Sequence, residues 1–166
     1  YMLGDYVRDK DAVTASLILT EMAAWYAAQG MTLFDALNAL YEKYGYYGEK
    51  THNLVMPGLD GLEKMAQLMR DLRADPPAAI AGVEVLRRKD YTDGSVIDCR
   101  TGEKSAMELS GSNVLRYELA DGTPILVRPS GTEPKIKVYV LTIGETPAAR
   151  DENLRKYGEW VKTLQR

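Results

Sequence analysis

Residues 115–144 read LRYELADGTPILVRPSGTEPKIKVYVLTIG. Apolar and polar residues alternate in three runs of this stretch, a pattern typical of strands with one buried face. Asp121-Gly122 lies between the first two runs and is a hairpin turn signal. A short loop separates the second run from the third. Short connections favour antiparallel pairing, so the stretch predicts three neighbouring antiparallel strands.

The segments before and after these strands supply helices and further strands. Helical spacing of apolar residues predicts helices over 12–28, 33–44 and 60–73, and a last helix that begins at Thr146-Pro147. Residues 46–56 and 83–89 read as strands, and 90–112 as a long polar connection with a hairpin around Thr101-Gly102. The order from residue 46 is strand, helix, four strands, helix. This predicts an α+β domain, an antiparallel sheet with two flanking helices.

The first 45 residues have a different character. Asp11 is the predicted N-cap of the first helix, and Thr32 with Asp35 resembles a capping box for the second. The first helix is apolar nearly all round, which predicts burial on several sides. Because no strand precedes these helices, we expect two helices left from a truncated α/β domain. The predicted domains are residues 1–45 and 46–166, with the boundary at Gly45-Tyr46.

Composition narrows the class of protein. The 166 residues are 45% apolar and 27% charged, a normal balance for a globular chain with a core. The net charge of −3 argues against a general nucleic-acid coat and a membrane-surface role. One cysteine and one histidine exclude an internal disulfide framework and a zinc site built from such ligands. We expect a cytoplasmic protein without a membrane partner.

The loop between the second and third strands carries the candidate chemistry. Arg128 offers a planar fork that matches two phosphate oxygens, and Lys135 and Lys137 share one strand face. Hydroxyls, a glycine and two prolines fill the turn, so guanidinium, hydroxyls and backbone amides can surround an anion. The alternative interpretation is an ordinary tight hairpin at the surface, because proline, serine, glycine and threonine are typical of any turn. The candidate phosphate-binding residues are Arg128, Ser130, Gly131, Thr132 and Lys137.

Three segments carry a resemblance to a known family. The run 128–135, RPSGTEPK, with Ile136 to Tyr139 behind it, resembles the phosphate-binding loop of the α-D-phosphohexomutases, the phosphoglucomutases and phosphomannomutases. Residues 4–13 resemble the segment after the sugar-recognition loop of the family's third domain, and the turn at 57–61 also has its family position. The chain thus resembles the end of the third domain and the whole fourth domain. For the latter, the resemblance implies a four-stranded core sheet with two helices, like TATA-binding-protein repeats.

The resemblance implies an enzyme that interconverts hexose 1-phosphate and hexose 6-phosphate through a bisphosphate intermediate. In such an enzyme, the five loop residues above bind the substrate phosphate. Arg8 and Lys10 lie near the sugar, and Lys10 is the one possible catalytic residue in this chain. The resemblance further implies Mg²⁺ held by residues outside this chain, a glucose 1,6-bisphosphate-type activator, and domains 1 to 3 of the same polypeptide as partner. Because the catalytic serine, metal cluster and sugar loop are missing, we expect the chain to be inactive alone.

Two alternatives remain at this point. A phosphopentomutase or a glucose-1,6-bisphosphate-producing relative shares the loop, because the loop contacts phosphate and not the sugar. A nucleic-acid-binding module is the alternative from another class, since a TATA-binding-protein-like sheet can present a face to a duplex, but the negative net charge speaks against it. Residues 87–89, two arginines and a lysine, read as an ordinary charged strand end. Gly158, inside the last helix, indicates close packing.

Overall fold

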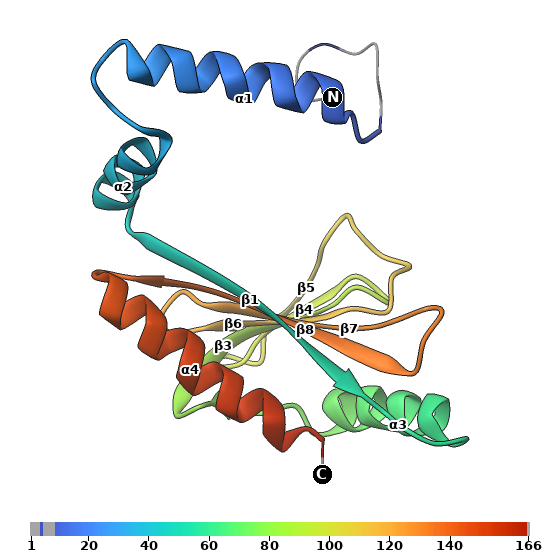
Figure 1. Ribbon diagram of the computed structural model, residues 1–166. Coiled ribbons are helices and arrows are strands. Elements are labelled where there is room, and N and C mark those ends of the chain that lie inside the picture. Colours follow the sequence, from blue (N-terminus) through green and yellow to red (C-terminus); the bar gives the residue numbers. More distant parts are fainter. Residues whose placement is uncertain (1–3, 5–8, 166) are drawn as a thin grey trace. The chain divides into compact units, whose positions relative to one another are not determined.

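The computed structural model describes Gly4 and residues 9–165, which divide into two compact units after Gly45 (Figure 1). The first unit contains helices α1 (Ala12–Ala27) and α2 (Leu33–Tyr44). Asp11 caps α1 by accepting from the amides of Val13 and Thr14, and Thr32 with Asp35 forms the predicted capping box of α2. Both helix starts are therefore confirmed.

The burial expected for α1 is not found. None of its residues is buried, and large apolar side chains such as Leu17 and Trp25 are more than half exposed. The prediction is wrong for the described residues because the first unit has no strand on which these side chains could pack. The helix α1 is apolar nearly all round, but its apolar side chains have no packing partner within this unit that buries them.

The second unit is an α+β domain with an antiparallel sheet, as predicted. Its elements are β1 (Tyr46–Val55), α3 (Gly61–Ala74), β2 (Ala79–Ile80), β3 (Val83–Asp90), β4 (Ser95–Asp98), β5 (Lys104–Ala106), β6 (Leu115–Leu119), β7 (Pro124–Pro129), β8 (Lys135–Gly144) and α4 (Pro147–Thr163). Over the described residues, the sheet has eight strands in the order β1-β8-β7-β6-β3-β4-β5, with β2 paired to β3. Every pair is antiparallel.

The expected four-stranded core sheet was too small. Short β2 adds to one end of β3, and the hairpin predicted around Thr101-Gly102 exists as β4 and β5, which extend the sheet beyond β3. No residue of the hairpin strands is buried, so they join the sheet mainly through main-chain hydrogen bonds. Apolar alternation alone therefore gave no signal for them.

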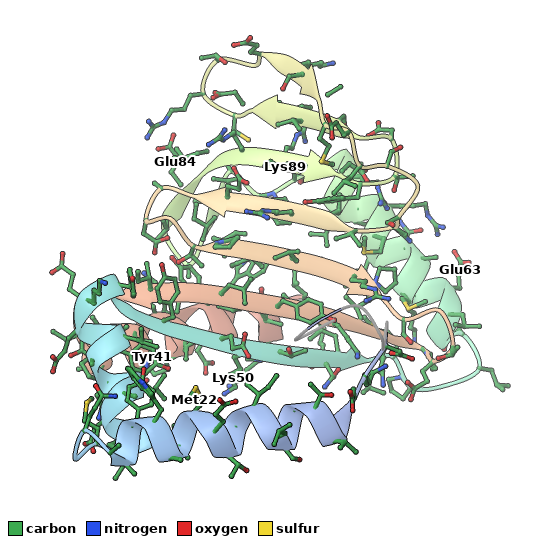
Figure 2. All side chains as sticks on the ribbon, turned by 90° about the horizontal axis from the view of Figure 1, so that it is seen from above. Met22, Tyr41, Lys50, Glu63, Glu84 and Lys89 are labelled. Carbon is green, nitrogen blue, oxygen red and sulfur yellow. The ribbon has the colours of Figure 1, made fainter. Side chains whose placement is uncertain are left out.

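Helices α3 and α4 both lie on one face of the sheet (Figure 1). The core lies between these helices and the sheet. It contains apolar side chains of the strands that are fully buried, among them Ile125, Val127, Ile136, Val138 and Val140. Because strand residues alternate between faces, the residues between these point to the other side. We call this other side, which faces away from α3 and α4, the open face; Figure 2 views it from above.

Candidate phosphate-binding site

Strands β7 and β8 place two cations side by side on the open face. Arg128 of β7 and Lys137 of β8 are direct register partners. Their neighbours Val127 and Val138 point into the core, which fixes the face that both cations occupy. Directly opposite residues of antiparallel strands have Cβ atoms about 5 Å apart. Neither cation forms a salt bridge with any residue that the structure describes.

The loop between the two strands is closed by its own hydrogen bonds. The Ser130 amide donates to the Lys135 carbonyl at 2.8 Å, which joins the two ends of the loop. Within it, the Lys135 amide donates to the Glu133 carbonyl at 2.7 Å, and the Thr132 amide donates to the Ser130 hydroxyl oxygen at 3.4 Å. Pro129 and Pro134 restrict the backbone at the two ends. The loop is therefore a short, restrained turn that holds two hydroxyls between the ends of β7 and β8.

A contact from outside the loop supports its far side. The Met56 amide, just after β1, donates to the Pro134 carbonyl at 2.8 Å. Gly61, the first residue of α3, allows this segment to approach closely: a Cβ at Gly61 would lie 2.2 Å from the Met56 carbonyl oxygen and 3.0 Å from the Pro134 Cβ. A side chain at this position would displace the support of the loop. The predicted turn at 57–61 thus has a definite place in the site.

One acidic and one basic residue at the end of the loop, Glu133 and Lys135, form an ion pair with each other. Lys135 Nζ lies 2.5 Å from Glu133 Oε2, and this hydrogen bond holds the pKa of the Glu133 carboxyl below its ordinary value. Lys135 therefore forms an ion pair with a carboxylate of the loop, whereas Lys137 acts on Glu133 only through a weaker charge attraction.

Gly131 stands at the exposed tip of the loop. No atom lies within 4 Å of the position that its Cβ would take, and its φ is not in the left-handed region. The loop backbone therefore does not require a glycine here for its own conformation. A requirement for glycine at residue 131 would have to come from a ligand that approaches the backbone.

Asn53 of β1 extends the row of Arg128 and Lys137 by one strand. It is the register partner of Lys137, so its exposed amide lies on the same face. Asn53 could not be recognised from the sequence, because its place beside the loop depends on the pairing of β1 with β8. Lys10 belongs to the first unit, is almost fully exposed and lies 3.4 Å from Asp9. Arg8 lies outside the described residues.

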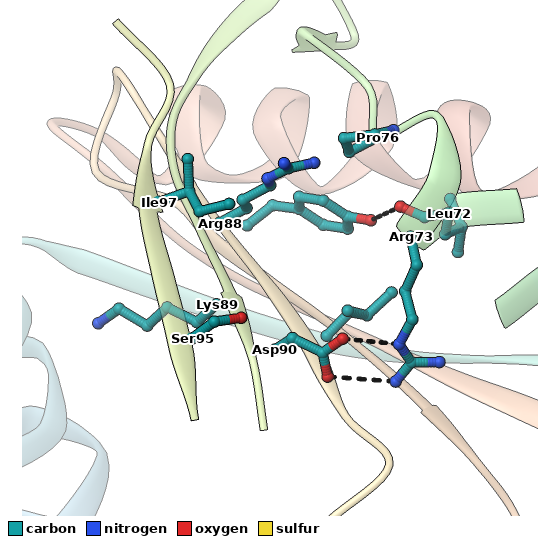
Figure 3. A pocket seen from close by; sticks show the side chains of 10 residues that line it. Leu72, Arg73, Pro76, Arg88, Lys89, Asp90, Ser95 and Ile97 are labelled. Atoms are coloured by element: carbon teal, nitrogen blue, oxygen red, sulfur yellow. Dashed lines mark hydrogen bonds and ion pairs between the residues drawn. The ribbon is translucent and has the colours of Figure 1, made fainter. Parts of the chain in front are cut away.

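A hollow lies between α3, β3 and β4 (Figure 3). The polar side chains around it form hydrogen bonds and an ion pair with one another. Arg73 of α3 binds Asp90 of β3 with two nitrogens, at 2.6 and 3.2 Å, and donates to Asn113 at 2.7 Å. The Tyr117 hydroxyl donates to the Leu72 carbonyl at 3.3 Å. With a volume of about 120 Å³, this hollow is smaller than typical small-molecule sites. Its ion pair fastens α3 to the sheet.

The described residues contain neither a cluster of metal ligands nor a membrane-spanning helix. No three His, Cys, Asp or Glu side chains gather there as metal ligands, so the residues present do not fit a magnesium site. In the same part of the chain, every helix is too short or too polar to cross a bilayer.

Comparisons with known proteins show to which family the chain belongs. Residues 53–151 match the family model described as phosphoglucomutase/phosphomannomutase, C-terminal domain. The phosphoglucomutase of Staphylococcus aureus strain N315 is 36% identical over 140 residues, which cover 84% of this chain and 25% of that protein. The phosphoglucomutase of Staphylococcus haemolyticus strain JCSC1435 is 34% identical over the same length and the same shares. The chain thus spans about a quarter of these relatives.

A solved structure shares the fold. The exocytosis-sensitive phosphoprotein pp63/parafusin of Paramecium, a phosphoglucomutase, aligns with 96% of this chain and 28% of its own, at a TM-score of 0.59 and 17% identity. The matched family model includes β6, β7, β8 and the loop at 130–134. The chain therefore belongs to the phosphoglucomutase/phosphomannomutase family and contains its C-terminal domain.

Proposed function

We propose that the hairpin of residues 128–137 binds the phosphate group of a phosphosugar. The observation that carries this proposal is the direct opposition of Arg128 and Lys137 on neighbouring strands. Like charges directly opposite each other destabilise a sheet. An anion bound between the two side chains would remove this repulsion and gain two charge-assisted hydrogen-bonding partners.

Each loop residue has a role in this proposal. The Arg128 guanidinium binds two phosphate oxygens through its planar fork. The Ser130 and Thr132 hydroxyls and the Gly131 amide donate hydrogen bonds, and Lys137 adds charge from β8. All these contacts are made to phosphate oxygens, and none is made to the sugar. This is the property that one fixed site needs if it accepts either end of a bisphosphorylated sugar.

We further propose that the whole enzyme interconverts hexose 1-phosphate and hexose 6-phosphate, of glucose or mannose, in the cytoplasm. The phosphoglucomutase relatives support the reaction class. Mg²⁺, the phosphorylated serine and the sugar-recognition loop belong in this proposal to domains 1 to 3 of the same polypeptide. Residues 1–45 are the end of the third domain, with Arg8 and Lys10 as weaker candidates for contacts near the sugar.

Calorimetric titration of the chain with glucose 1-phosphate tests the proposal. Arg128→Ala should weaken binding by roughly 2 to 4 kcal/mol, because a bidentate contact to a doubly charged group is lost. Gly131→Ala should leave the free energy of unfolding unchanged and still weaken binding, because its methyl group would stand where the phosphate meets the amide.

Arg100→Ala is the matched control. Arg100 lies in the same unit but is already paired with Glu84 at 2.5 Å, so its loss should not change glucose 1-phosphate binding. Equal affinity of Arg128→Ala and the unsubstituted chain would refute the assignment of the loop.

A further inference from the structure

A second group of charges lies on the open face, three strands from β1. Glu118 of β6 contacts three cations: Lys89 Nζ at 2.7 Å, Arg87 Nε at 3.1 Å and Arg116 Nη2 at 3.2 Å. Arg87 and Lys89 come from β3 and are the register partners of Glu118 and Arg116. We call these four residues the Glu118 cluster. Figure 2 labels Lys89 on this face of the sheet.

The Glu118 cluster has an excess of positive charge. Other ion pairs of this unit are matched one to one, as in Arg73 with Asp90 or Arg100 with Glu84. Here a single carboxylate faces three cations, so the formal charge of the cluster is +2. The three cations hold the pKa of the Glu118 carboxyl below its ordinary value although burial acts to raise it. The carboxylate is therefore ionised, and the cluster keeps an excess of positive charge. Asp98, the register partner of Arg87 on β4, offsets this excess only from beyond ion-pair distance.

The cluster also has an unused donor. Arg116 Nε is buried and has no hydrogen-bond acceptor among the described residues. The side chains of Glu118 and Lys89 are only 19% and 23% exposed, so bulk water screens these charges less than it screens surface pairs. An unsatisfied buried donor beside an excess of positive charge is costly unless an acceptor binds.

A hollow of about 320 Å³ lies at this cluster. Arg87, Arg116 and Glu118 line it, together with Gly122 and Pro124 of the β6–β7 turn. This turn lies at the opposite end of β7 from the 130–134 loop, and Leu126 is the register partner of Arg116 on β7. The hollow is therefore a different place from the proposed phosphosugar loop, on the same face of the sheet.

We propose that the hollow at the Glu118 cluster is a second anion site, which binds a small ligand through a doubly charged phosphate group. The hollow is lined by two arginines and one carboxylate, and Lys89 adds positive charge beside it. The two guanidinium groups offer the planar donor geometry that phosphate oxygens prefer. The volume lies at the lower end of small-molecule sites, which accommodates a phosphate with a small organic body and not a large ligand. Glu118 reduces the repulsion between the cations and orients them when no anion is bound.

Inorganic phosphate is the probe for this site, in the full 166-residue chain with Arg128→Gln, so that the proposed loop site does not compete. Two-dimensional NMR should show phosphate-dependent shifts of the Arg87 and Arg116 Nε–Hε signals. Arg116→Gln should weaken this binding about tenfold or more, the effect expected when a charged hydrogen bond is lost. Arg100→Gln, which removes a matched surface arginine, should not change it. Lys89→Gln replaces Arg116→Gln if the latter does not fold.

Glu118→Gln gives a test of opposite sign. If Glu118 is only a structural partner of the cations, its removal loosens them and phosphate binding does not improve. If the hollow is an anion site, the formal charge rises to +3 and phosphate should bind several-fold more tightly.

Three results would overturn the proposal: no shift of the two arginine signals by phosphate, shifts that Arg116→Gln leaves unchanged, or shifts produced by a DNA duplex and not by phosphate. Failure of the loop assignment is seen separately with glucose 1-phosphate, by comparing Arg128→Ala with its parent in the Arg116→Gln background, where the second site is weakened.

Discussion

At the residue scale, Arg128 and Lys137 differ from the other cations near the loop because no described carboxylate neutralises them. The alternation in the sequence correctly indicated that Lys135 and Lys137 share a strand face. It could not indicate that Arg128 is the direct partner of Lys137, because register depends on how the loop closes, through the Ser130–Lys135 hydrogen bond. It also could not show that Glu133 forms its ion pair with Lys135 and not with Lys137.

His52 allows a prediction about pH. Its imidazole is partly buried between β1 and α4, its Nε2 has no partner in the described structure, and burial, together with Lys50 and Lys162, lowers its pKa below the ordinary value. The folded chain therefore keeps His52 neutral at a pH where the unfolded chain already binds a proton. The free energy of unfolding should fall as pH decreases through about 6.5, with a slope of at most one proton, about 1.4 kcal/mol per pH unit.

Urea unfolding between pH 7.5 and 5.5 measures this effect. Trp25→Phe leaves Trp160, which packs against the core of the second unit, as the fluorescent reporter of that unit. His52 is the single histidine of the chain, so the His52→Gln variant should lack this part of the slope. An identical slope in the variant would show that His52 is not its source.

At the element scale, α4 contains a glycine where helix propensity favours almost any other residue. A Cβ at Gly158 would lie 3.0 Å from His52 Cε1, so the glycine lets α4 approach β1 closely. Gly158→Ala should destabilise the second unit by about 1 kcal/mol net. The steric contact with the packed imidazole costs more than the roughly 1 kcal/mol that alanine gains in helix propensity.

The double variant His52→Ala, Gly158→Ala separates the two effects. With the imidazole removed, the alanine at residue 158 should stabilise relative to His52→Ala alone, as measured by Trp160 fluorescence. Stabilisation by Gly158→Ala in the presence of His52 would contradict the close packing inferred here.

The elements that the sequence predicted best are those with a local signal. Period-2 alternation located β6, β7 and β8, and side-chain capping marked the start of α1 and α2. Elements that depend on distant partners were harder to predict. Strands β4 and β5 have no buried residues, and the Glu118 cluster joins β3 to β6, so residues 87–89 looked like an ordinary charged strand end. Sequence spacing reports one strand at a time and does not show which strand lies beside it.

At the scale of the whole molecule, we propose that the chain alone supplies only part of what phosphoryl transfer requires. Transfer needs a phosphate donor, charge neutralisation and positioning of the acceptor, and the described residues contain no metal cluster. We predict that the 166-residue chain forms no glucose 6-phosphate from glucose 1-phosphate with glucose 1,6-bisphosphate and Mg²⁺. A coupled dehydrogenase assay measures this, with full-length Staphylococcus aureus phosphoglucomutase as positive control. Turnover above a blank without protein would contradict the prediction.

The pairing of β1 with β8 has a consequence for biosynthesis. Residues 46–55 find their partners at 135–144, the last strand before the final helix. On the ribosome, β1 is made first and must wait until β8 emerges, while α3 and the β6–β7 hairpin can already form from nearby residues. Pairing of strands that are far apart in the sequence slows folding, and it leaves aggregation-prone intermediates with exposed apolar surface. Nascent chains of this domain should therefore depend on chaperones until translation has passed Gly144.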